Sequence, residues 1–124
     1  MVAEKIQTFT QLNAWKEAHV LVVWIYTLTK RFPKEELFCL VSQMRRASIS
    51  ITSNIAEGFS RQTWKEKAQF YSIALGSLRE LHSQLLVARD VGYIADDLCQ
   101  EGERHIDSVS RLLRGLLKKS QSMI

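Results

Sequence analysis

The sequence predicts an all-α protein folded as an antiparallel, up-down-up-down four-helix bundle. The chain of 124 residues contains only one Pro and five Gly, too few of the turn residues that a fold of many short strands needs. Apolar residues recur at three- and four-residue steps over four long segments, as one face of a helix requires. The composition, 46% hydrophobic and 24% charged, is globular, and the length fits a single domain over residues 1–124.

The first two helices are expected over residues 12–31 and 34–57. The first has the apolar stripe Leu12, Trp15, Ala18, Val22, Tyr26 and Thr29. It ends before Pro33, because proline disfavours the α conformation in the residue that precedes it. The second has the stripe Leu37, Leu40 or Val41, Met44, Ser48, Ile51 and Ile55. We expect Gly58 to take the left-handed conformation just past its end.

The third and fourth helices are expected over residues 63–91 and 94–119. Thr63 and Glu66 have the spacing of a capping box, and Gly92 ends the third helix. The fourth carries a heptad-like stripe of Ile94, Leu98, Gly102, His105, Val109, Leu112 and Leu116. Consecutive helices are joined by only a few residues, so neighbours should run antiparallel.

Cysteine usage and hydropathy limit the compartment and the chemistry. Cys39 and Cys99 are far apart and no apolar signal segment is visible, so we expect a reduced, cytoplasmic protein. The longest uncharged run, residues 18–29, is shorter than the roughly 20 apolar residues that span a bilayer. Neither metal-ligand spacings nor a glycine-rich phosphate loop nor a nucleophile beside a base occurs. We therefore expect no membrane span, no metal, no cofactor and no enzymatic activity.

The expected first helix is more apolar than one buried face requires. Val20, Val23, Trp24 and Leu28 lie beside or opposite its core stripe. Surplus apolar surface of this kind is typical of a subunit interface, so we expect a homo-oligomer that uses these four residues. The alternative is that loops or the N-terminal arm cover them.

A polar line follows one face of the second expected helix, and a second line follows the third. The lines consist of Gln43, Arg46, Ser50, Asn54 and Glu57, and of Ser77, Glu80 and Gln84. One interpretation pairs them as partly buried networks, with Arg45 or Arg46 beside Glu57 or Glu80. A second makes them a ligand or nucleic-acid surface, and a third makes them a solvated helix face.

Two basic clusters are the candidates for nucleic-acid contacts. Arg61, Lys65 and Lys67 alternate with aromatic residues, and basic groups neutralise phosphates while aromatic rings stack on unpaired bases. Equally, the aromatic residues continue a core stripe while the charges face water. Arg111, Arg114 and Lys118 share a face of the last helix. They form a candidate phosphate-binding edge, although cations here also complement the helix dipole.

Several segments carry a family resemblance: FPKEELF, QMRRASISITSNIAEGFSR, IALGSLREL with Gln84, and GYI at residues 92–94. Together they resemble the 23S rRNA intervening-sequence protein family, also called the four-helix bundle protein family, over residues 9–117. The family pattern falls on Gln43, Arg45, Arg46, Asn54, Glu57, Gly58, Gly76, Ser77 and Glu80, none of which is known as catalytic. Cys39 departs from it, because the family commonly has glycine there, and this bears on local helix packing.

The resemblance implies a bacterial four-helix bundle that assembles into a ring-like homopentamer. It also implies kinship with accessory proteins of diversity-generating retroelements, which are pentameric bundles that bind a reverse transcriptase and nucleic acid. With a net charge of +4, we expect a non-enzymatic oligomer that binds RNA or a nucleoprotein partner through basic surface. The alternative is a protein-protein interaction scaffold that binds no nucleic acid.

Overall fold

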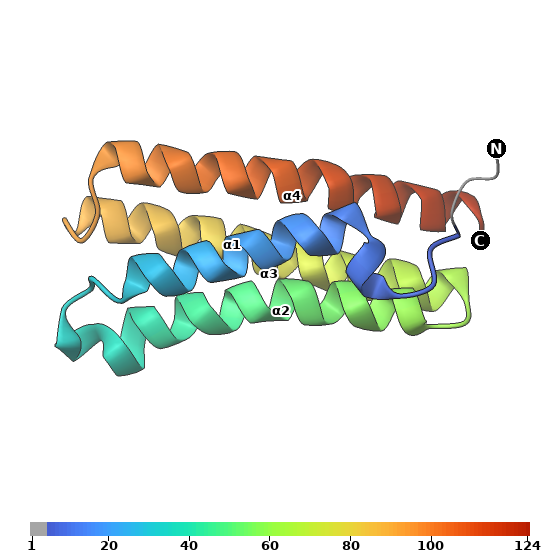
Figure 1. Ribbon diagram of the computed structural model, residues 1–124, viewed down its shortest axis with the longest axis horizontal. Coiled ribbons are helices and arrows are strands. Elements are labelled where there is room, and N and C mark those ends of the chain that lie inside the picture. The colour runs from blue at the N-terminus through green and yellow to red at the C-terminus, as the bar shows by residue number, and fades with distance from the viewer. Residues whose placement is uncertain (1–4) are drawn as a thin grey trace.

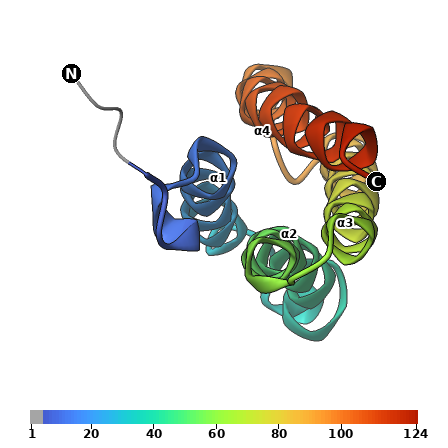
Figure 2. The same cartoon turned by 90° about the vertical axis from the view of Figure 1, so that its right-hand side faces the viewer.

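Four long helices form an antiparallel bundle in the computed structural model, which describes residues 5–124 (Figure 1). They are α1 (Asn13–Thr29), α2 (Ser42–Ser60), α3 (Trp64–Asp90) and α4 (Asp96–Ser122), preceded or joined by the short turns η1 (Phe9–Gln11), η2 (Lys34–Glu36) and η3 (Leu37–Val41). Viewed along the bundle, each helix packs against the next in the chain, and α4 packs against α1 (Figure 2). The predicted fold class is confirmed.

The core lies between the four helices and comes from the periodic apolar positions. Its largest fully buried side chains include Leu21, Ile25, Met44, Ile51, Ile55, Leu81, Leu85, Val109 and Leu113. Burying one such side chain contributes about 1.5–3 kcal/mol, which makes this shared core the main stabilising element.

Two of the predicted helix boundaries rest on confirmed signals. The Thr63 side chain accepts a hydrogen bond of 3.1 Å from the backbone N–H of Glu66, as a helix N-cap does. Gly92 follows α3 with a φ of +87°, a conformation that glycine adopts at no steric cost. All four helices differ from their expected spans at their ends, and the fourth begins at Asp96 and continues to Ser122.

The segment before α2 is not the continuous helix that the sequence predicts. A 3₁₀ turn, η2, leads into a π turn, η3, in which Cys39 has φ −119° and ψ −105°. The Glu36 carboxylate accepts hydrogen bonds from the backbone N–H of Leu40 (3.1 Å) and from the Tyr93 hydroxyl (2.8 Å). This carboxylate therefore caps the turn and ties it to the connection between α3 and α4.

Gly58 lies inside α2 and does not take the left-handed conformation that we expected, so that prediction is wrong. A Cβ atom at this position would stand 2.6 Å from Cε1 of Tyr71 and 3.2 Å from Cβ of Phe70. Glycine is needed here because α2 and α3 approach closely, with the buried Tyr71 ring lying against the α2 backbone.

Candidate nucleic-acid interface

Charge is distributed unevenly along the bundle. One end is formed by the start of α1, the α2–α3 connection and the C-terminal part of α4, on the right of Figure 1. Residues 5–19, 53–75 and 110–124, which make up this end, contain nine basic and three acidic side chains. Residues 20–52 and 76–109 contain eight basic and nine acidic side chains. We call the first set the basic end.

All six basic residues nominated from the sequence lie at the basic end. The fold thus brings the cluster of Arg61, Lys65 and Lys67 to the same end as the cluster on α4, which is more than 40 positions away in the chain. The side chains of Lys65, Arg111, Arg114 and Lys118 are exposed. These four cations are the main candidates for contacts with a polyanion.

Arg61 is partly neutralised by neighbouring carboxylates. Its guanidinium lies 3.2 Å from the Glu57 carboxylate and 4.0 Å from that of Glu66. It also stands 4.7 Å from the centre of the Phe70 ring. Arg61 therefore helps to order the α2–α3 connection, and it contributes less free charge than the other cations.

Lys67 is engaged within the chain. Its ammonium donates hydrogen bonds to the backbone oxygens of Phe59 (2.6 Å) and Gly58 (3.3 Å). Burial lowers the pKa of Lys67 below its ordinary value. The last carbonyls of a helix lack partners within that helix, so Lys67 caps the end of α2. Lys67 is therefore less available for phosphate contacts than the exposed cations.

The aromatic residues of this connection belong mainly to the protein interior. Tyr71 is buried, and burial raises the pKa of its hydroxyl above the ordinary value. Trp64 and Phe70 are half-buried. Tyr71 is therefore not available to stack on a base, and the core-stripe interpretation holds for this residue.

The two polar lines meet between α2 and α3. The hydroxyls of Ser50 and Ser77 share a hydrogen bond of 2.8 Å, and the Asn54 amide donates to the Ser50 backbone oxygen at 2.7 Å. On α3, the Gln84 amide donates to the Glu80 carboxylate at 3.2 Å. A groove of about 410 Å³ runs beside these contacts, lined by Gln43, Arg46, Ala47, Ser50, Ser77 and Glu80.

One interpretation pairs Arg45 or Arg46 with Glu57 or Glu80, and among the described residues of this single chain no such ion pair occurs. Arg45 instead donates from Nε to the Thr29 hydroxyl at 3.0 Å and stands 4.7 Å from the centre of the Tyr26 ring. Two positions along a helix turn the side chain through about 200°. Arg45 therefore faces α1, whereas the line that starts at Gln43 faces α3.

The four interface candidates on α1 differ in how exposed their side chains are. Val20 and Val23 are 46% and 53% exposed, as an interface requires. Leu28 is buried in the core, so its assignment to a surface is wrong, because it continues the inward stripe of Leu21 and Ile25. Trp24 is half-buried against α4, where its ring lies 5.6 Å from that of His105.

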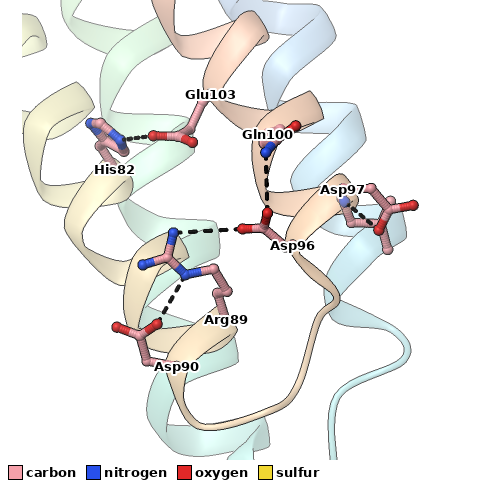
Figure 3. A network of polar contacts seen from close by, with 8 residues as sticks. His82, Arg89, Asp90, Asp96, Asp97, Gln100 and Glu103 are labelled. Atoms are coloured by element: carbon pink, nitrogen blue, oxygen red, sulfur yellow. Dashed lines mark hydrogen bonds and ion pairs between the residues drawn. The ribbon is translucent and has the colours of Figure 1, made fainter.

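Basic and acidic groups are matched at the opposite end of the bundle (Figure 3). His82 of α3 and Glu103 of α4 are joined by a hydrogen bond of 2.8 Å. Arg89 contacts the carboxylates of Asp90 at 2.9 Å and Asp96 at 3.8 Å. The His82–Glu103 and Arg89–Asp96 contacts link α3 to α4.

A polar pocket between α3 and α4 contains four polar residues that were not nominated from the sequence: Arg79, His82, Asp107 and Ser110. The signal that identifies Arg79 is a seven-residue spacing. Positions 65, 72 and 79 share one face of α3, and positions 107, 114 and 121 share the facing side of α4.

Residues 5–124 contain no group of three or more His, Cys, Asp or Glu side chains arranged to hold a metal ion. None of the helices in this range combines the length and the apolar character needed to cross a membrane. Both cysteines are unpaired, with Cys39 exposed and Cys99 buried.

Comparison with known proteins gives matches of two kinds, to a solved structure and to a protein family. The chain is similar over most of its length to a crystal structure of a protein of unknown function from the S23 ribosomal protein family of Bacteroides thetaiotaomicron. The TM-score is 0.78 with 23% identity, covering 85% of this chain and 95% of the other, which supports the fold alone. No curated protein matches. Residues 10–115 match the family described as 23S rRNA-intervening sequence protein, and the chain therefore belongs to that family.

Proposed function

We propose that this protein is a non-enzymatic, oligomeric four-helix bundle that binds RNA or a nucleoprotein partner through its basic end. The observation that carries the proposal is the excess of nine basic over three acidic side chains at that end. Cations that contact phosphates release the counterions condensed on a nucleic acid, which drives binding independently of sequence. The proposal includes no catalytic step, no metal and no cofactor, and it places the protein in the cytoplasm.

Assembly strengthens this proposal. The exposed Val20 and Val23 offer an apolar contact surface for a second copy. In the pentameric ring that the family resemblance implies, five chains of +4 carry about +20, and the basic surface is presented repeatedly to one ligand. The implied kinship with accessory proteins of diversity-generating retroelements points to the same kind of partner.

The test is fluorescence anisotropy with labelled structured RNA, over about 50–200 mM salt. We expect the logarithm of the affinity to fall linearly with the logarithm of salt concentration. Lys65→Gln and Lys118→Gln should each weaken binding and reduce the slope by about 1, as expected for one lost phosphate contact.

Two control variants distinguish an effect of the basic end on affinity from an effect of net charge and from an effect of helix capping. Lys34→Gln removes the same charge from the opposite end, so it should leave the affinity almost unchanged. Lys67→Gln should lower stability more than affinity, because Lys67 caps α2. Absence of binding at low salt contradicts the proposal and favours the scaffold alternative. An equal loss in Lys34→Gln contradicts the assignment to the basic end.

A further inference from the structure

The pocket between α3 and α4 has the features of an anion site. Its volume is about 230 Å³. Its floor includes the buried side chains Leu78 and Ile106, and its polar wall consists of Arg79, His82, Asp107, Ser110 and Arg114. The two arginines come from two different helices, so the rigid bundle fixes their spacing.

Both guanidinium groups are free to bind a ligand. Among residues 5–124, neither Arg79 nor Arg114 has a carboxylate within 4.0 Å. Arg114 donates from Nε to the Ser110 hydroxyl at 3.0 Å, which orients the side chain while its terminal nitrogens stay unused. The Ser110 hydroxyl, acting as acceptor there, keeps its own proton to donate.

Two further titratable residues line the pocket, His82 and Asp107. His82 uses Nε2 in its contact with Glu103. Asp107 is the one carboxylate on the wall, and it opposes an anion. Among the lining residues, two guanidiniums stand against one carboxylate.

We propose that this pocket binds a phosphate group, held by Arg79, Arg114 and Ser110. Arginine suits this ligand because its planar fork donates to two phosphate oxygens at once. Where the bound phosphate belongs to RNA, the inference rests on the proposed function. Arg114 belongs to the basic end, and residues 65 to 79 of α3 span about 21 Å at 1.5 Å per residue. A nucleic-acid strand that contacts Lys65 would have to follow α3 over this distance to place a phosphate in the pocket. Inorganic phosphate is the alternative source of the same chemistry.

The test titrates the ¹⁵N-labelled full chain with inorganic phosphate at constant ionic strength and follows the amide signals of the pocket by NMR. We expect saturable shifts at residues around 79 and 110, and at least a tenfold weaker affinity in Arg79→Gln. Asp107→Asn should tighten binding, because it removes the opposing charge. Arg104→Gln is the matched control, since Arg104 is an exposed arginine of α4 outside the pocket.

The RNA anisotropy assay then identifies the source of the phosphate. Weaker RNA binding in Arg79→Gln, with Arg104→Gln unchanged, supports a backbone phosphate. Phosphate binding with unchanged RNA affinity supports the pocket and assigns it to free phosphate. The proposal is overturned if phosphate causes no saturable shifts, or if Arg104→Gln weakens phosphate binding as much as Arg79→Gln. The proposed function is judged separately, by Lys65→Gln and Lys118→Gln.

Discussion

Gly58 and Gly76 show that identical residues have opposite roles in neighbouring helices. At Gly58 an added Cβ would stand 2.6 Å from the buried Tyr71 ring, whereas at Gly76 it would meet nothing within 4 Å. The same substitution therefore changes packing at one position and only helix propensity at the other.

We expect Gly58→Ala to destabilise the protein and Gly76→Ala to stabilise it. Overpacking costs about 1–3 kcal/mol, whereas replacing glycine by alanine inside a helix stabilises the helix by up to about 1 kcal/mol. The net loss at Gly58 should therefore be on the order of 1 kcal/mol, while Gly76→Ala gains about 0.5–1 kcal/mol. Urea unfolding followed by circular dichroism measures both. A gain of stability in Gly58→Ala would show that the Tyr71 ring moves aside freely.

Individual residues also mark the limit of what the sequence predicts about the site. The sequence predicted which cations belong to the candidate interface, but not which groups each cation contacts. Lys65 and Lys67 look equivalent in the sequence, yet only Lys67 reaches the carbonyls at the end of α2. Such contacts depend on how two helices pack, which the local sequence pattern does not reveal.

At the scale of elements, the apolar periodicity predicted the four helices but not the irregular segment before α2. Apolar periodicity and local caps such as Thr63 act over a few residues, so the sequence records them directly. The π turn at Leu37–Val41 escaped prediction because LFCLV is compatible with a regular helix. Its tie from Glu36 to Tyr93 joins residues 57 positions apart.

The contact between α1 and α2 at Arg45 gives a matched test on adjacent arginines. Arg45→Ala removes a hydrogen bond to Thr29 and a cation–π contact with Tyr26. We expect a loss of about 1–2 kcal/mol in unfolding free energy. Arg46→Ala should stay within about 0.5 kcal/mol of the wild type, because Arg46 is exposed. Equal effects in urea unfolding at one protein concentration would refute the role given to Arg45.

At the scale of the whole molecule, assembly is tested on valines of equal exposure. Val20 and Val23 of α1 are 46% and 53% exposed, and Val87 and Val91 at the end of α3 are 47% and 56% exposed. We expect the pair Val20→Ser and Val23→Ser to lower the assembled mass in light scattering. The pair Val87→Ser and Val91→Ser should leave it unchanged. A monomeric wild type at micromolar concentration, or equal effects of both pairs, would exclude α1 as the interface.

The charge difference between the two ends has a consequence for how the molecule moves. An elongated body that is positive at one end and nearly balanced at the other has an electric dipole along its long axis. In the field of a polyanion such a body rotates before contact, so that the end carrying the α2–α3 connection arrives first. Collisions then become productive more often than random orientation allows, and salt removes this advantage by screening the field. If the proposed function holds, the uneven charge therefore sets a direction of approach in addition to a contact surface.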